Sequence, residues 1–200
     1  MDASAWDARY AEADQVWSIG PNEFVAEECA GLSPGIAVDL ACGEGRNAIW
    51  LADLGWQVTG VDFSPVAIEK ARSRRSDGVD WVCADALDWT PPGPVDLVVI
   101  AYLQLPAAQR RRAVRNAVSM LGPHGRLVLV AHDSSNLTEG VGGPSDPRVL
   151  YTAEDVLADL DGLRYDVHRA GRVGRVVAGE GAHRATDGVA QDCLVVLTAR

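Results

Sequence analysis

Residues 38–46 read Val-Asp-Leu-Ala-Cys-Gly-Glu-Gly-Arg, and this stretch decides the fold. Its apolar first half, interrupted by one acid at Asp39, is typical of a buried parallel strand. Gly43 and Gly45 follow, and glycine lets a backbone turn tightly and approach a ligand closely. The residues after this turn predict a helix that begins there. A strand, a glycine turn and a helix N-terminus together predict a site for a nucleotide-type cofactor.

Strands and helices alternate around this stretch. Strands are expected at 36–41, 57–61, 79–83, 95–101 and 126–130. Helices are expected at roughly 4–13, 22–30, 47–54, 106–120 and 152–160, with a further one after Ser64-Pro65, where serine caps and proline opens a helix. The β-rich runs 163–178 and 188–199 predict an antiparallel hairpin. The sequence therefore predicts an α/β fold, a Rossmann-like, mostly parallel seven-stranded sheet with helices on both faces and a C-terminal antiparallel hairpin.

The charge balance limits the partners. The chain has 28 acidic and 18 basic residues, a net charge of −10, which repels phosphate backbones, so we expect no nucleic acid. The arginine-rich run 110–115 fans around a helix and predicts only a solvated helix start. Because no apolar run approaches the ~20 residues that span a bilayer, we expect no membrane partner either.

Length and cysteine usage predict the organisation of the chain. Its 200 residues fit one domain, 1–200, with 1–30 as an N-terminal helical cap and 133–151 as a substrate-side loop. The N-terminus lacks the features of a secretory signal, and four scattered cysteines form no C-x-x-C pair. We therefore expect a cytoplasmic protein, a monomer or homodimer, without a metal site.

Three acids follow or lie in the first three strands, namely Asp39, Asp62 and Asp85. Ligands of open α/β sheets bind at the carboxyl ends of the strands. There Asp62 can accept both hydroxyls of a ribose, and Asp85 the amine of an adenine. Asp39, beside the glycine turn, suits a positive charge and opposes a pyrophosphate. S-adenosylmethionine carries ribose, adenine, an ammonium and a sulfonium without phosphate, so it is the predicted cofactor.

The chain resembles the class I S-adenosylmethionine-dependent methyltransferases over roughly 36–131. The resemblance rests on VDLACGEG, VTGVDFS at 58–64, CADALDW at 83–89, VDLVVIAYLQLP at 95–106 and LGPHGRLVLV at 121–130. It implies that Gly43, Gly45 and their neighbours cradle the cofactor's amino-acid end, that Asp62 holds the ribose, and that Asp85, the backbone at Ala86 and the ring of Phe63 meet the adenine. Ala41 departs from the pattern, because the family most often has glycine there.

A narrower resemblance links residues 6–25 and the GRNA segment from Arg46 to the tellurite-resistance and thiopurine-type small-molecule methyltransferases. It implies an N-terminal segment folded over the cofactor, with Trp17 and Arg46 as cofactor contacts and Tyr10 as a substrate contact; Trp6 and Arg9 are further candidates. Trp6 and Tyr10 are also four residues apart, which equally fits a helix packed on the core.

The resemblance implies methyl transfer to a small-molecule acceptor through a sulfur, nitrogen, oxygen or chalcogen atom, with S-adenosylhomocysteine as the product. Tyr102 falls where this superfamily often lines its acceptor site. His132 ends the fifth strand at the same edge and is the candidate general base, with Asp133 beside it as a possible influence on its protonation. The alternative for His132 is an ordering role at the loop.

Two other functions stay open from the sequence. An NAD-dependent oxidoreductase shares the glycine pattern and an acid like Asp62, although Asp39 opposes its pyrophosphate and Asp85 is left unexplained. A non-catalytic S-adenosylmethionine-binding module would need no acceptor site, against which the loop 133–151 argues weakly.

Overall fold

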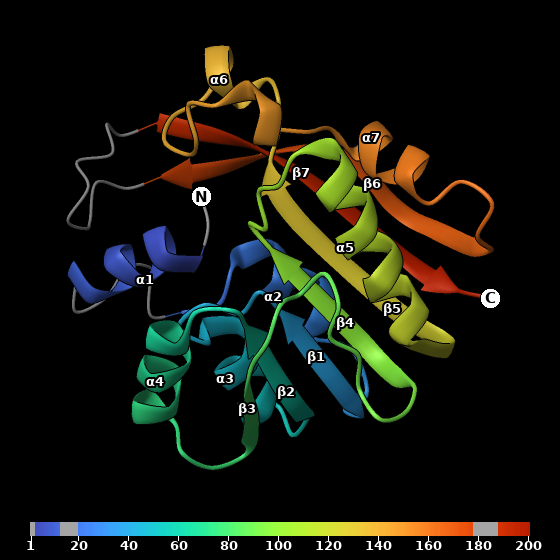
Figure 1. Cartoon of the computed structure of the whole chain (residues 1–200). Helices are drawn as coiled ribbons and strands as arrows, with labels where there is room; N and C mark the ends of the chain where they lie inside the picture. Colours follow the sequence, from blue (N-terminus) through green and yellow to red (C-terminus); the bar gives the residue numbers. More distant parts are fainter. Residues whose placement is uncertain (1–2, 13–19, 178–187) are drawn as a thin grey trace.

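One seven-stranded sheet runs through the molecule in the order β3-β2-β1-β4-β5-β7-β6 (Figure 1). The computed structural model describes residues 3–12, 20–177 and 188–200. The strands are β1 (Ile36–Leu40), β2 (Gln57–Asp62), β3 (Val79–Cys83), β4 (Val95–Ala101), β5 (Leu121–His132), β6 (Tyr165–Val177) and β7 (Gly188–Ala199). The first five pair in parallel, whereas β7 is antiparallel to both β5 and β6. The predicted fold class, including its terminal hairpin, is confirmed.

Helices cover both faces of this sheet (Figure 1). They are α1 (Ala3–Glu12), α2 (Glu23–Cys29), α3 (Arg46–Asp53), α4 (Pro65–Arg74), α5 (Ala107–Met120), α6 (Asn136–Glu139) and α7 (Ala153–Asp159), with a short 3-10 helix η1 (Pro147–Val149). Ser64 caps α4 as predicted: its Oγ accepts from the Ala67 N–H at 3.1 Å. None of the helices in the described ranges is long and apolar enough to cross a bilayer.

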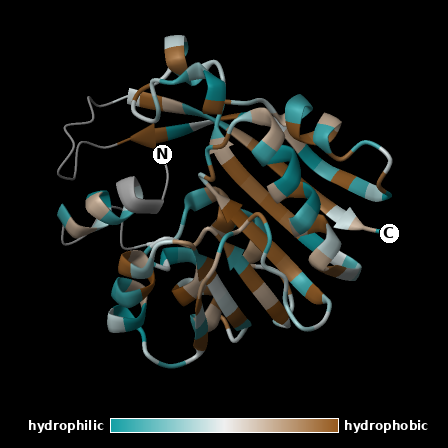
Figure 2. Ribbon diagram, viewed as in Figure 1, coloured by the Kyte–Doolittle hydropathy of each residue, from teal (hydrophilic) through white to brown (hydrophobic). Residues whose placement is uncertain are grey.

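Two apolar layers hold the helices against the sheet. Side chains of β1, β4 and β5 alternate between them: Val38 and Leu40 join the layer under α5 and α7, while Ala37 joins the layer under α2 and α3. Figure 2 shows the strands mostly brown and the outer helix surfaces largely teal, as this burial requires. Because β1, β2, β4 and β5 pair in parallel, their carboxyl ends lie along one edge of the sheet.

Strand β5 begins earlier than the predicted 126–130. Leu121 already pairs with Val95 of β4, and the register then shifts before Leu97 pairs with Arg126. The apparent helix-breaking segment 121–125 is thus taken into the strand by this irregularity. The predicted carboxyl end of the strand, at His132, is unaffected.

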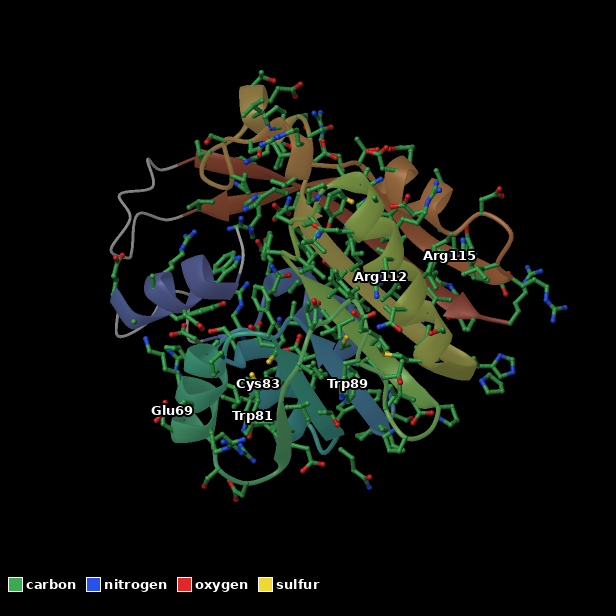
Figure 3. The ribbon with its side chains drawn as sticks, viewed as in Figure 1. Glu69, Trp81, Cys83, Trp89, Arg112 and Arg115 are labelled. Carbon is green, nitrogen blue, oxygen red and sulfur yellow. The ribbon has the colours of Figure 1, made fainter. Side chains whose placement is uncertain are left out.

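The arginine run on α5 is not merely a solvated helix start. Arg110 is buried, and its Nε lies 2.6 Å from Oδ2 of Asp159 on α7. Arg112 pairs with Asp88, and Arg115 donates to the carbonyl oxygen of Asp159; both arginines are labelled along α5 in Figure 3. These contacts hold α5 against α7 and against the segment that contains Asp88.

The loop 133–151 is an ordered segment that includes α6 and η1. The side chain of buried Asn136 donates to the carbonyl of Gly142 at 2.9 Å and accepts from the Gln191 N–H at 2.7 Å. One amide side chain thus ties the loop to β7. This fixes the loop beside the carboxyl end of β5.

Candidate active site

The tips of β1 and β2 are joined by the carboxylate of Asp62. Its Oδ2 accepts from the Gly43 N–H at 2.8 Å, and its Oδ1 accepts from the Ser64 N–H at 2.9 Å. Burial raises the pKa of Asp62, although these backbone donors oppose the shift. The glycine turn and the predicted ribose acid therefore form one unit before any ligand binds.

Gly45 shows why this turn needs glycine. Its φ of +82° lies in the left-handed region, and a Cβ there would stand 2.3 Å from Cη2 of Trp81. Trp81, labelled in Figure 3, lies on β3 and donates from Nε1 to the carbonyl of Arg75 at 2.9 Å. The indole leaves no room for a side chain where α3 begins.

Ala41 occupies the position at which the resemblance leads one to expect glycine. Its φ is +62°, so the chain keeps the left-handed backbone that glycine favours and accepts the strain of a Cβ, about 1–2 kcal/mol. The next N–H, of Cys42, donates to the carbonyl of Val61 at 2.9 Å and holds the turn to β2. Burial raises the pKa of the Cys42 thiol, which is consistent with an inert side chain.

Asp39 is a buried carboxylate with one free oxygen. The side chain is fully buried; Oδ2 accepts from the Ala48 N–H of α3 at 3.0 Å, while Oδ1 has no hydrogen-bond partner among the described residues. Burial raises the pKa of Asp39 to about 7, against a lowering by the neighbouring Arg46. An unpaired buried oxygen beside a glycine turn is suited to a cationic donor, and it opposes a phosphate.

The expected adenine contacts lie at the ends of β2 and β3. Asp85 is exposed, and its Oδ1 accepts from the Leu87 N–H at 2.9 Å. Ala86 is buried, with its carbonyl accepting from the Asn116 side chain at 3.1 Å, and Phe63 is half-buried. The two strands pair in parallel through Asp62 and Cys83, so these residues share the edge with Asp62.

Helix α1 packs on α4, next to Asp62. Ser64 donates from Oγ to Asp7, and Lys70 donates from Nζ to the carbonyl of Tyr10. The Tyr10 ring is buried and stacks on Trp6, with ring centroids 5.6 Å apart. The predicted substrate residue Tyr10 thus lies on the β2 side of the sheet, whereas Tyr102 and His132 follow β4 and β5. Trp17 lies outside the described residues.

Tyr102 and His132, the two residues expected at the acceptor edge, lie next to each other. Their ring centroids are 4.8 Å apart with an interplanar angle of 38°. Tyr102 has a φ of +62°, which is strained for a bulky residue, and its N–H donates to the carbonyl of Val130 at 2.8 Å. With this backbone conformation at the end of β4, the ring of Tyr102 lies against that of His132.

Asp192 of β7 lies at the centre of this group. Its side chain is fully buried; Oδ2 accepts from the Tyr102 hydroxyl and from Nε of Arg175, both at 2.7 Å, and Oδ1 lies 3.1 Å from Nδ1 of His132. Burial raises the pKa of Asp192, but these three neighbours outweigh burial and hold it below its ordinary value. The group therefore contains an ionised carboxylate surrounded by donors.

Asp133, the neighbour of His132 in sequence, does not pair with its imidazole. The Asp133 carboxylate accepts from the N–H and Oγ of Ser135, at 2.9 and 2.7 Å. The partner of His132 is Asp192, which lies opposite it in the antiparallel register of β5 and β7. Neighbours along a strand point to opposite faces, whereas residues paired across two strands point the same way.

The site has two halves, which we call the cofactor half, around Asp39 and Asp62, and the acceptor half, around Tyr102, His132 and Asp192. Arg46 lies between them. It opens α3 directly after the glycine turn, and its guanidinium carbon is 5.9 Å from the centroid of the Tyr102 ring. Arg175 lies 5.4 Å from the same centroid. Burial lowers the pKa of Arg46, against the opposing effects of Tyr102, Asp39 and Asp192. The predicted cofactor residue Arg46 therefore also adjoins Tyr102, the predicted acceptor contact.

Comparison with known proteins agrees with this geometry. Residues 37–125 match the family model described as a methyltransferase domain. The chain is 32% identical to nodulation protein S of Sinorhizobium fredii over 60% of this chain and 62% of the relative. It is 30% identical to thiopurine S-methyltransferase of Stutzerimonas stutzeri over 61% of this chain and 63% of the relative. The solved N-methyltransferase NodS of Bradyrhizobium japonicum, in complex with S-adenosyl-L-homocysteine, shares the fold with a TM-score of 0.71 at 22% identity, covering 99% of each chain.

The chain is thus similar to methyltransferases, both in the segment 37–125 that matches the domain model and in these relatives. It spans a little over three fifths of the length of the curated relatives above. The thiopurine relative confirms the expected resemblance to small-molecule methyltransferases.

Sequence reasoning missed several residues of this candidate site. Asp192 and Arg175 come from the terminal hairpin, and Asn22, the N-cap of α2, donates from Nδ2 to the Tyr102 hydroxyl at 3.1 Å. One signal was available: Asp192 interrupts an apolar strand just as Asp39 does. Within the described parts of the chain, no group of three or more His, Cys, Asp or Glu side chains is arranged to hold a metal ion.

Proposed function

We propose that the protein transfers a methyl group from S-adenosylmethionine to a small-molecule acceptor. The observation that carries this proposal is the buried pair Asp39 and Asp62 at the glycine turn, where one carboxylate oxygen is left for a cationic donor. The proposal is supported by the nodulation and thiopurine methyltransferase relatives and by the methyltransferase family model.

Different residues of the site fit different parts of the cofactor. Asp62 would accept the ribose hydroxyls, and Asp39 with the turn at Gly43 would face the ammonium end. Asp85, with Ala86 and Phe63 beside it, would border the adenine. When bound, the cofactor supplies a methyl group already activated by a positively charged sulfur.

The remaining chemistry falls to the acceptor side of the site. An in-line displacement needs an acceptor held at the methyl carbon, shielded from water, and relieved of its proton where it carries one. Tyr102 and His132 lie at the carboxyl ends of β4 and β5, next to Arg46 of the cofactor half. We propose that His132 takes that proton and that the ring of Tyr102 borders the acceptor.

The two alternative functions are less well supported. A dinucleotide would bring its pyrophosphate to the turn, where the unpaired oxygen of Asp39 would repel it. A binding module without catalysis has no use for a strained tyrosine and a histidine arranged around a buried acid.

Thermal unfolding with S-adenosylmethionine, S-adenosylhomocysteine and NAD in parallel tests the cofactor. A ligand at about a hundred times its dissociation constant stabilises the protein by about 2.7 kcal/mol. We expect both adenosyl ligands to raise the melting temperature and NAD to leave it unchanged. Stabilisation by NAD alone would reject the proposal. Methyl transfer to a panel of thiols, heterocycles and phenols, followed by mass spectrometry, then identifies the acceptor.

Cofactor binding is expected to depend on pH through Asp39. Below about pH 7 this carboxyl is protonated in the free protein, so a cationic ligand must displace the proton before it binds. Affinity for S-adenosylhomocysteine should therefore fall by up to about tenfold per unit as the pH drops below 7 and level off above it.

Two calorimetric controls isolate this effect. The ligand 5′-methylthioadenosine lacks the ammonium group, so its affinity should vary little over the same pH range. Asp39→Asn keeps an acceptor for the Ala48 N–H and should remove the pH dependence for S-adenosylhomocysteine. An equal pH dependence for both ligands would count against the assignment of Asp39.

A further inference from the structure

Two polar atoms in the acceptor half have each other as their available partner. Nδ1 of His132 and Oδ1 of Asp192 lie 3.1 Å apart in a charge contact, and neither atom makes a well-aligned hydrogen bond with any described residue. Both atoms are buried, so water does not replace the missing partner. The carboxylate charge at this distance favours a proton on Nδ1, whereas a proton on Nε2 would leave a lone pair facing a carboxylate.

We propose that Asp192 is a positioning residue that keeps the proton of His132 on Nδ1, so that Nε2 is the atom that removes a proton from the methyl acceptor. This inference rests on the proposed function and deepens it. It also names the acceptor class, a protic nucleophile such as a thiol, hydroxyl or amine, as distinct from one that arrives already ionised.

Asp192 is itself held in place by donors. Its Oδ2 receives the Tyr102 hydroxyl and Nε of Arg175, and Arg175 offsets the buried negative charge. The Tyr102 hydroxyl accepts from Asn22, so its own hydrogen is directed to Asp192. Asn22 is fixed in turn, because its N–H donates to Oδ1 of Asn47 on α3 at 2.9 Å. With Oδ2 fully engaged, Oδ1 is the oxygen left for the histidine.

The imidazole of His132 also lies against the substrate-side loop 133–151, at Gly143. Nε2 has no hydrogen-bond partner among the described residues, and the side chain is 12% exposed. Gly143, with a φ of +79°, lies over the face of the ring, because a Cβ there would lie 2.9 Å from Cδ2, 3.0 Å from Cγ and 3.0 Å from Nε2. Any larger residue would crowd the nitrogen. The glycine thus leaves Nε2 accessible beneath an ordered loop.

The proposed step balances in atoms and charge. A lone pair of the acceptor atom forms the new bond to the methyl carbon, while the carbon–sulfur bond breaks and its electrons pass to sulfur. The acceptor's proton moves to Nε2 of His132, and the resulting imidazolium faces the ionised Asp192. The products are the methylated acceptor and neutral-sulfur S-adenosylhomocysteine, and the proton later leaves to solvent.

Nitrogen NMR of the protein labelled with ¹⁵N-histidine tests the inference without an acceptor. At about pH 8, where an ordinary histidine is neutral, we expect His132 to show a protonated Nδ1 and an unprotonated Nε2. The signal is assigned by its disappearance in His132→Gln. A protonated Nε2 in the unaltered protein, whether in the other tautomer or in a doubly protonated ring, would overturn the proposal.

Asp192→Asn provides the second arm, with Asp133→Asn as the matched control. The amide can place its NH₂ group against Nδ1, which shifts the proton to Nε2. We therefore expect an unprotonated Nδ1 and a protonated Nε2 in this variant. Asp133 is also a buried acid and is next to His132 in sequence, but its carboxylate binds Ser135, so its replacement should leave the tautomer unchanged. An unchanged tautomer in folded Asp192→Asn would contradict the positioning role. Should that variant not fold, the unaltered protein decides the question. S-adenosylmethionine binding, measured on the same samples, separates a failure here from a failure of the proposed function.

Discussion

Asp62→Ala is expected to weaken the binding of S-adenosylmethionine by at least about 100-fold. In the free protein this carboxylate already joins the glycine turn to the tip of β2 through Gly43 and Ser64. Hydrogen bonds to a charged acceptor contribute about 1.5–3 kcal/mol each, so losing two to the ribose removes at least about 3 kcal/mol. Isothermal titration with S-adenosylmethionine and S-adenosylhomocysteine measures the loss.

The control must match the change in charge without touching the turn. Asp80 on β3 is exposed, and Asp80→Ala removes one negative charge from the neighbouring strand. We expect its dissociation constant to stay close to that of the unaltered protein. Because Asp62→Ala also removes two backbone contacts, its folded state is checked by urea unfolding before titration. A folded Asp62→Ala with unaltered affinity would refute the assignment of the ribose site.

His132→Ala is expected to reduce turnover by about 10²- to 10⁴-fold, the usual contribution of a positioned acid–base group. The reason is that the protic acceptor keeps its proton when no imidazole is present at the end of β5. Stabilisation by S-adenosylmethionine should be nearly unchanged, since the histidine lies outside the cofactor half. Initial rates are measured with the acceptor that the methyl-transfer panel identifies.

Added imidazole provides a direct check of this role. A small base that enters the space left by His132→Ala should restore part of the rate in proportion to its concentration. His168→Ala serves as the control, because that histidine lies exposed on β6 and contacts Thr198. Full turnover by His132→Ala would leave His132 with an ordering role at the loop, the alternative that the sequence kept open.

The positions of the proposed cofactor residues could be predicted because these residues are close in sequence to the elements that place them. Asp39, Asp62 and Asp85 each lie within or just after a strand of one parallel unit, so strand order alone brings them to one edge. Even the departure at Ala41 was visible, although only the backbone angle of +62° explains how the chain accommodates it.

The acceptor half could not be predicted in the same way. Asp192 faces His132 through a strand pairing that spans 60 positions of sequence, and nothing local reports the register of that pairing. Proximity in sequence favoured Asp133, which the alternation of a strand directs elsewhere. The prediction for the arginines of α5 was incomplete for a related reason. The buried partner of Arg110 is Asp159, which lies far away in sequence, on α7.

The two halves of this site come from different segments of the chain. The proposed contacts of the methyl donor lie on or just after β1, β2 and β3, whereas Arg175 and Asp192 lie on the last two strands, β6 and β7. A terminal hairpin can therefore diverge without disturbing the recognition of the donor. We expect a chimera that exchanges residues 161–200 with those of a relative to retain its donor and to change the molecules it modifies.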